Sequence, residues 1–192
     1  MLDVRPLRKT ERHPAIFRRY DSLAVGEHFV LINSHDPKHL RDEFDVEFPG
    51  GYRWDYLERG PGLWRIQIGK AAATALPRVL GDTNTITTDS DPGAAGAIWK
   101  LQMSSRDLDS NIIALPAGGG IDAHTGPDLD VLLHVLSGSG TLTTELGDIE
   151  LAAGAIVWLP RRSRRQFLAG PDGLSYLSVH QRRQSLGLLG PS

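Results

Sequence analysis

Residues 1–70 contain two kinds of hydrophobic spacing, which alternate along the chain. In RHPAIFRRYDSL the apolar side chains fall at helical intervals, which places on one face Ile16, Phe17, Tyr20 and Leu23. We expect a helix there with Pro14 in its first turn, where the missing N–H costs no hydrogen bond. The segments LDVRPL before this helix and EHFVLIN after it have the composition of short strands.

A second helix is predicted after Asp36-Pro37, because this pair has the order of an N-cap followed by the first helical position. Leu40 and Phe44 then lie four residues apart on one face. YRWDYLERGPGLWRIQIGK alternates rings and charges on both sides of Gly60-Pro61-Gly62, which predicts a β-hairpin. The resulting order β-α-β-α-β-β predicts a two-layer α+β domain over residues 1–70.

The pattern changes after residue 70. Residues 71–95 are rich in small and polar side chains, Gly and Pro, which is typical of an exposed linker. From residue 96 to 184 the chain is a series of short strand-like runs separated by Gly, Pro and Asp, and a tail of 185–192 follows. Because closure removes exposed strand edges, this segment predicts an all-β barrel or sandwich.

Composition and charge limit the function classes. The chain has 192 residues, enough for two small domains, and a formal net charge of −2. This charge argues against a global nucleic-acid or membrane-surface binder, since neither has a wide basic field to act on. The start of the chain lacks an apolar signal-peptide core, and no apolar run reaches the roughly 18 to 20 residues that span a bilayer. We therefore expect a cytoplasmic protein.

The chain contains no cysteine. Disulfides, thiolate metal sites, persulfide carriers and cysteine nucleophiles are therefore excluded. Any chemistry must rest on histidine, carboxylates, hydroxyls or arginine.

The N-terminal segment resembles a known family in five short sequence motifs, DVRPL, ERHPAIF, SHDPKHL, WDYLERGP and WRIQI. That family is the bacterial domain of unknown function 2249, and the resemblance covers nearly all of residues 2–70. The family is similar to the sulfur carriers TusA and SirA, whose chemistry depends on a Cys-Pro-x-Pro motif before the first helix. The matching residues here run from Arg8 to Pro14 and contain no cysteine, so the carrier function does not transfer to this chain.

A polar cluster of Arg12, His13, His35 and Asp36 is expected near the two helix starts of this domain. Free backbone N–H groups at helix N-termini favour anions, so the cluster is a candidate recognition surface. The alternative is that these side chains only cap, pair or remain solvated.

The spacing of glycine, histidine and proline in the β-rich segment resembles a second family. His124 follows Gly118, a strand leads to Gly138, and Pro160 follows Gly154. These positions are similar to the two motifs of the cupins, small antiparallel barrels also called double-stranded β-helices. The resemblance covers about residues 96–183 and implies a homodimer formed through the cupin domain.

The metal-binding positions of the cupin pattern are mostly replaced. His124 fills the first histidine position, but the second is Gly126 and the third, counted from Pro160, is Arg165. The glutamate position falls on Val131, with Asp130 one residue out of register, and a one-residue shift in a strand points a side chain to the other face. An always-protonated guanidinium is not a metal ligand and repels divalent cations. We therefore expect no cofactor.

One alternative keeps a metal. His180 lies in LSYLSVH, a predicted late strand, and would complete with His124 and Asp130 a two-histidine, one-carboxylate set for one divalent metal. The protein would then be a cupin enzyme of the dioxygenase or isomerase type. The competing interpretation is that His180 only ends its strand and pairs with a carboxylate or a backbone carbonyl.

The segment RRSRR, residues 161–165, is the strongest sign of an anion site. Guanidinium groups bind carboxylate or phosphate through two parallel N–H bonds, and alternation in a strand would send about half of the segment inward. A solvated or acid-paired turn explains the same residues equally well. Nucleic acid is a poorer explanation, because aromatic platforms near the cluster are sparse.

These observations predict two domains and favour a non-catalytic role. The sequence predicts no catalytic residue, and it leaves open whether the protein is an enzyme. We expect a binding or regulatory protein whose cupin pocket holds a small anion, and the predicted ligand-binding residues are His124, Asp130, Arg162, Arg165 and His180. The alternatives are the metal enzyme and an interaction scaffold.

Overall fold

The computed structural model describes residues 1–182 and divides the chain into two compact units, with the boundary between Arg78 and Val79. The predicted tail, 185–192, and the last two residues assigned to the barrel, 183–184, lie outside the described residues. Among residues 1–182 no helix is long and apolar enough to cross a membrane.

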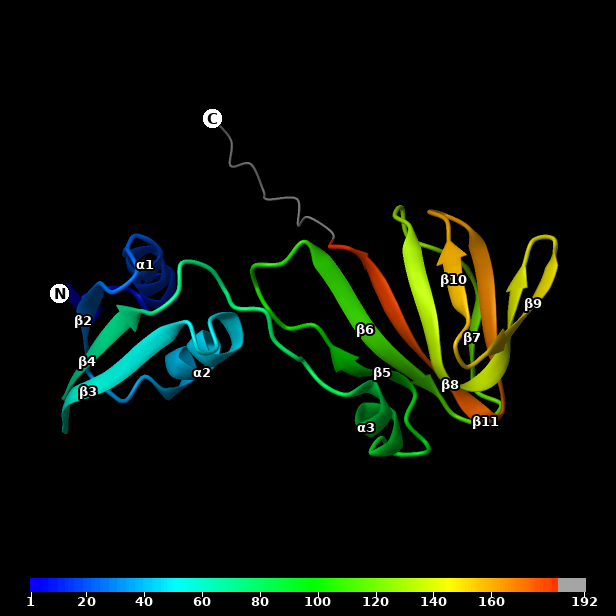
Figure 1. The fold of residues 1–192 in the computed structure, drawn as a ribbon, viewed down its shortest axis with the longest axis horizontal. Coiled ribbons are helices and arrows are strands. Elements are labelled where there is room, and N and C mark those ends of the chain that lie inside the picture. The colour runs from blue at the N-terminus through cyan, green and yellow to red at the C-terminus, as the bar shows by residue number, and fades with distance from the viewer. Residues whose placement is uncertain (183–192) are drawn as a thin grey trace. The chain divides into compact units, whose positions relative to one another are not determined.

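The first unit has the predicted order β-α-β-α-β-β (Figure 1). Its four-stranded sheet has the order β1-β2-β4-β3, in which β1 and β2 are parallel and the other pairs are antiparallel. The elements are β1 (Leu2–Asp3), α1 (Lys9–Asp21), β2 (His28–Asn33), α2 (Lys38–Glu47), β3 (Tyr52–Gly60) and β4 (Leu63–Lys70).

Both helices of this unit pack on one face of the sheet. The helical spacing noted in the sequence places Ile16 and Tyr20 of α1 in the core, together with Leu40 and Phe44 of α2. The Phe44 ring stacks on Phe17 with their centroids 4.8 Å apart. The amphipathic patterns therefore identify the buried faces of both helices.

Two details of the predicted helix starts are wrong. Helix α1 begins at Lys9, so Pro14 lies in its interior and not in its first turn. The helix includes the polar residues before Pro14, and its N-cap, Arg8, makes no side-chain capping hydrogen bond that would mark the start in the sequence. Helix α2 has Pro37 at its N-cap, and Asp36 does not cap it. The Asp36 carboxylate instead accepts a 2.9 Å hydrogen bond from the Tyr56 hydroxyl on β3.

The second unit is the all-β barrel that the sequence predicts (Figure 1). The predicted linker region also contains a short helix, whose N-cap Asp82 accepts from the Asn84 N–H. The elements of the unit are α3 (Thr83–Thr88), β5 (Gly96–Lys100), β6 (Leu108–Leu115), β7 (Gly120–Thr125), β8 (Val131–Thr144), β9 (Gly147–Ala152), β10 (Ile156–Leu159) and β11 (Arg164–Gln181).

Two long strands, β8 and β11, hold the barrel together. They pair with each other along most of their length, and each is flanked by two further strands in succession: β10 and β9 beside β8, and β7 and β6 beside β11. The pairing is interrupted between Ala169 and Leu174. At this bend Gly138 has φ +74°, and a Cβ there would lie 2.1 Å from the Gly173 carbonyl oxygen. Only glycine permits such a close approach of the two strands.

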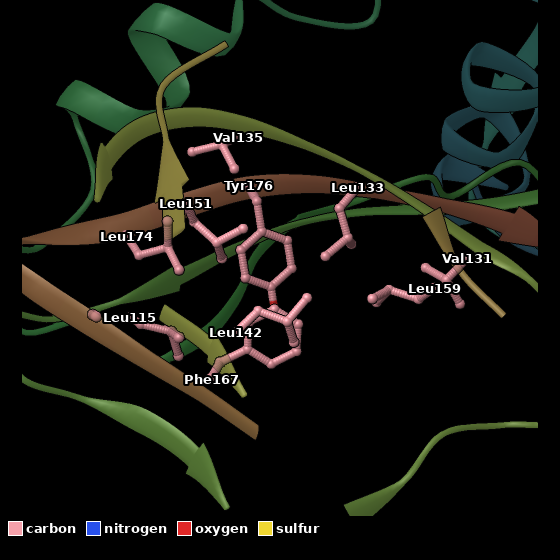
Figure 2. Packing of buried hydrophobic residues seen from close by; sticks show 11 residues of the cluster. Leu115, Val131, Leu133, Val135, Leu142, Leu151, Leu159, Phe167, Leu174 and Tyr176 are labelled. Atoms are coloured by element: carbon pink, nitrogen blue, oxygen red, sulfur yellow. The ribbon is translucent and has the colours of Figure 1, made fainter. Parts of the chain in front are cut away.

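The barrel core is apolar at its centre. Figure 2 shows the Tyr176 and Phe167 rings, both from β11, with leucine side chains of the neighbouring strands around them. The two rings stack with their centroids 5.5 Å apart. Because Phe167 is inward, the alternation along β11 also directs Arg165, two residues earlier, toward the interior.

Candidate functional site

The RRSRR segment separates into inward and outward side chains where β11 begins. Arg165 is only 4% exposed, whereas Arg164 and Gln166 on either side of it are exposed. The alternation expected for a strand therefore buries one guanidinium of the cluster in the barrel.

The Arg165 guanidinium contacts backbone atoms of the turn that precedes its own strand. Its Nε donates to the Ser163 carbonyl oxygen at 3.3 Å, and its Nη2 lies 3.5 Å from the Pro160 carbonyl oxygen. Both contacts are long for charge-assisted hydrogen bonds, which are about 2.7–2.9 Å. The guanidinium therefore retains donor capacity.

Gly126 provides the space that this guanidinium occupies. A Cβ at residue 126 would lie 1.6 Å from the Arg165 Nη2. The Gly126 N–H also donates to the Ser163 carbonyl oxygen at 2.9 Å, which ties the two loops together. Any side chain at residue 126 would force the guanidinium to move.

Arg165 has no acidic partner in the part of the chain that the structure describes: no carboxylate there lies within ion-pair distance of it. Burial lowers the pKa of Arg165, and interaction with Tyr176 opposes that shift. Burial also raises the pKa of Tyr176 to about 12, so this phenol is neutral at pH 7 and is not a counter-ion. A guanidinium stays protonated under these conditions, so the barrel holds a buried cation with no carboxylate of residues 1–182 within ion-pair distance.

A pocket of about 300 Å³ opens beside Arg165. The Ser163 hydroxyl in its lining is buried and has no hydrogen-bond partner among residues 1–182. Buried polar groups in proteins are generally hydrogen-bonded, so an unpaired hydroxyl next to an unpaired cation points to a ligand or water at this place. The remaining lining is mostly apolar and includes Leu142, Leu146, Ile149, Val157, Trp158, Leu159 and Pro160.

Two exposed charges complete the lining. Arg164 and Glu145 both line the pocket and both are exposed to solvent. Together with Arg165 they give two cations against one anion. The charged side chains of the lining therefore sum to one positive charge, and Arg165 is the buried one among them.

The predicted partner Arg162 lies elsewhere. Its side chain is exposed and pairs with Asp128, with Nη2 2.6 Å from Oδ2, and this ion pair lowers the pKa of the Asp128 carboxyl. Arg162 also has φ +59°, the left-handed conformation that favours glycine. Residue 162 thus has a backbone conformation typical of glycine, while its side chain is exposed.

The three residues of the metal alternative, His124, Asp130 and His180, make separate contacts in the described part of the chain. No group of three His, Asp or Glu among residues 1–182 could hold a metal ion. The Asp130 carboxylate instead accepts from the Arg161 N–H at 2.9 Å, and the exposed His124 ring has Nδ1 2.8 Å from the Asp122 carbonyl oxygen. The Nδ1 atom of His180 lies 2.9 Å from the Gln181 carbonyl oxygen at the end of β11.

The predicted recognition surface of the first unit is a set of separate local contacts. His13 Nδ1 lies 2.9 Å from Glu43 Oε1 on α2, and Arg12 donates to the Leu7 carbonyl oxygen. His35 Nδ1 lies 3.3 Å from the Ser34 hydroxyl oxygen. Within residues 1–182, no hydrogen bond or ion pair joins Arg12, His13, His35 and Asp36 to one another.

Comparison with known proteins found a family model for the first unit and similar solved structures for the second. Residues 1–70 match the family model described as Uncharacterized conserved protein (DUF2249). The first unit is therefore called the DUF2249 unit below. No curated protein matches the chain.

The second unit resembles several solved structures. A cupin protein from Bacteroides fragilis is 26% identical, with 47% of this chain and 75% of that chain covered and a TM-score of 0.38. A cupin-2 domain containing protein from Shewanella frigidimarina is 16% identical, with coverages of 54% and 95% and a TM-score of 0.43. The polyketide cyclase RemF from Streptomyces resistomycificus is 22% identical, with coverages of 43% and 61% and a TM-score of 0.39. The all-β second unit, which is similar to these structures, is called the cupin-type unit below.

Sequence reasoning found Arg165 and missed most of its surroundings. Counting from Pro160 identified the position, and strand alternation allowed an inward side chain. Ser163 was visible within RRSRR, but its burial was not. No sequence pattern pointed to Ile149 or Val157 as lining residues, because β9 and β10 reach the pocket only through their pairing with β8.

Proposed function

We propose that the cupin-type barrel binds a small anion on the Arg165 guanidinium and has a non-catalytic binding or regulatory role. One observation carries this proposal: Arg165 is 4% exposed and has no carboxylate partner within the described residues. A buried charge without a partner costs several kcal/mol, and a bound anion offsets that cost. The unpaired Ser163 hydroxyl is a second polar group for the same ligand.

The position of Arg165 also explains why an anion is favoured over a divalent metal. In the cupin pattern residues 126 and 165 are both histidine positions. Here the Arg165 guanidinium fills the space that is free because Gly126 has no side chain. A fixed positive charge there repels a metal cation and attracts an anion.

The experiment is thermal unfolding of the full chain with acetate or inorganic phosphate at pH 7 and constant ionic strength. Binding to the native state should raise the melting temperature in proportion to the logarithm of the anion concentration above the dissociation constant. Arg165→Gln should lose this increase. Arg162→Gln removes the same charge from the neighbouring exposed position and should keep it.

Two outcomes contradict the proposal. One is a wild-type melting temperature that neither anion changes. The other is a shift that persists in Arg165→Gln, because the anion would then bind elsewhere.

We also propose that two copies of the chain associate through the outer face of β10. This strand is at the edge of the described sheet, and its Ile156 and Trp158 are 70% and 64% exposed. Leu132, which pairs with Trp158, is 48% exposed on the same face. Adjacent exposed apolar side chains at a sheet edge suit a self-complementary interface. Sedimentation should show a dimer that Ile156→Glu dissociates and that Leu168→Glu, at the outward face of β11, leaves intact.

A further inference from the structure

The pocket beside Arg165 has apolar walls that a purely polar anion would not use. Leu142 and Leu159 in its lining are 1% and 5% exposed, and Val157 packs against the barrel core. Burial of apolar ligand surface against such walls is favourable by about 25 cal/mol per Å². A ligand that contacts the guanidinium and these walls must therefore be apolar along one part and anionic at the other.

Ile149 shows that the apolar wall reaches the mouth of the barrel. It pairs with the inward-facing Leu142 across β8 and β9, and cross-strand partners share a face of the sheet. Ile149 is nevertheless 44% exposed, whereas Leu151, two residues further along the same face, is 2% exposed. An inward-facing isoleucine that stays exposed marks the place where an apolar group can enter.

The charges of the lining favour one negative charge on the ligand. Arg165 is its buried cation, and the second cation, Arg164, is exposed and shares the rim with Glu145. The dianionic form of phosphate, HPO4 2−, would place its second charge in surroundings without a buried cation. A carboxylate matches the guanidinium with two parallel N–H bonds and carries a single charge.

We infer that the ligand is a small monocarboxylate with an apolar chain or ring, bound with its carboxylate on Arg165 and its apolar part against Leu142, Ile149 and Val157. This inference rests on the proposed anion function. The pocket volume of about 300 Å³ is at the small end for ligand sites, which typically measure about 300–1,000 Å³. Long fatty acids and nucleotides are therefore too large to be enclosed.

The test is a calorimetric titration of the full chain with acetate, butyrate, hexanoate and inorganic phosphate. Each buried methylene should tighten binding by about fourfold, so hexanoate should bind on the order of a hundredfold more tightly than acetate. Phosphate should bind no more tightly than acetate.

Two variants separate the parts of the site. Ile149→Ser should reduce the preference for hexanoate over acetate and leave acetate affinity unchanged, because the altered side chain contacts only the apolar part. Arg165→Gln should abolish binding of the whole series. Leu168→Ser is the matched control, because Leu168 is 53% exposed on the outward face of β11 and should change neither affinity.

The outcomes distinguish this inference from the proposed function. If wild-type protein binds none of the four anions, the anion function itself is wrong. Two results would overturn the monocarboxylate inference: equal binding of acetate and hexanoate, or tighter binding of phosphate than of hexanoate. If Arg165→Gln abolishes the binding in either case, the anion function itself stands. Loss of binding in the Leu168→Ser control, with its fold intact by circular dichroism, would also overturn the monocarboxylate inference.

Discussion

At the scale of single residues, Arg165 combines features that rarely occur together. It is charged and buried, and its protein contacts are two long hydrogen bonds to backbone carbonyls. Interiors that hold charges usually pair them, because an uncompensated buried ion is strongly destabilising. A buried charge that has no ion-pair partner within residues 1–182 is best explained by binding.

The first prediction follows from this cost. Arg165→Met keeps a similar length and removes the charge, so it should stabilise the ligand-free protein by about 1–2 kcal/mol, as replacement of buried ions by apolar side chains often does. Urea denaturation of both proteins in anion-free buffer measures this difference. Destabilisation by a similar amount would mean that the charge is satisfied within the protein.

Between neighbouring elements, the loop after β7 and the start of β11 depend on each other. Gly126 and Arg165 are 39 positions apart, and the nearest approach of a Cβ at residue 126 would be to the tip of the arginine side chain. Because that tip is flexible, an added methyl group should displace it at little cost in stability. The displaced guanidinium would then leave the ligand position.

The second prediction uses this dependence. Gly126→Ala should lower hexanoate affinity at least about tenfold, the effect of 1.4 kcal/mol, while the free energy of unfolding changes by less than about 1 kcal/mol. Calorimetry on the wild type and on Gly126→Ala measures the hexanoate affinity, and urea denaturation of the same two proteins measures the free energy of unfolding. Unchanged hexanoate affinity in Gly126→Ala would contradict the dependence of the ligand position on this glycine.

The element scale also shows what the sequence can predict. Alternating helical and two-residue spacings were enough for all six elements of the DUF2249 unit, because each pattern is local. The start of α1 was predicted too late along the chain. Proline is common in the first turn of a helix, so Pro14 suggested that the helix begins there. The candidate site was predicted at Arg165 from spacing, but the walls at Leu142, Ile149 and Val157 depend on long-range strand pairing that no local pattern encodes.

For the whole molecule, the chain consists of two compact units, each with its own hydrophobic core. The candidate anion site lies in the cupin-type unit. The likeness of the DUF2249 unit to sulfur carriers stays a prediction about fold alone. It does not extend to their function, because a chain without cysteine cannot form a persulfide.

The third prediction concerns the boundary between the units. Val79 is 90% exposed and follows Arg78, a trypsin site. Limited trypsin treatment should therefore cleave after Arg78 before it cleaves within either unit, since exposed connections are cut before packed cores. Intact mass spectrometry would identify the fragment 1–78. Arg78→Gln should remove that cut, and earlier cleavage inside the strands of either unit would contradict the division.

The most direct test of the anion site is a crystal structure of the full chain with hexanoate. The account predicts that the carboxylate oxygens lie about 2.7–2.9 Å from the Arg165 guanidinium, with the alkyl chain along Ile149 and Val157. The Ser163 hydroxyl should contact the ligand or a water molecule bound to it. Hexanoate bound away from Arg165, or an Arg165 guanidinium paired with a carboxylate of the protein, would contradict the central claim.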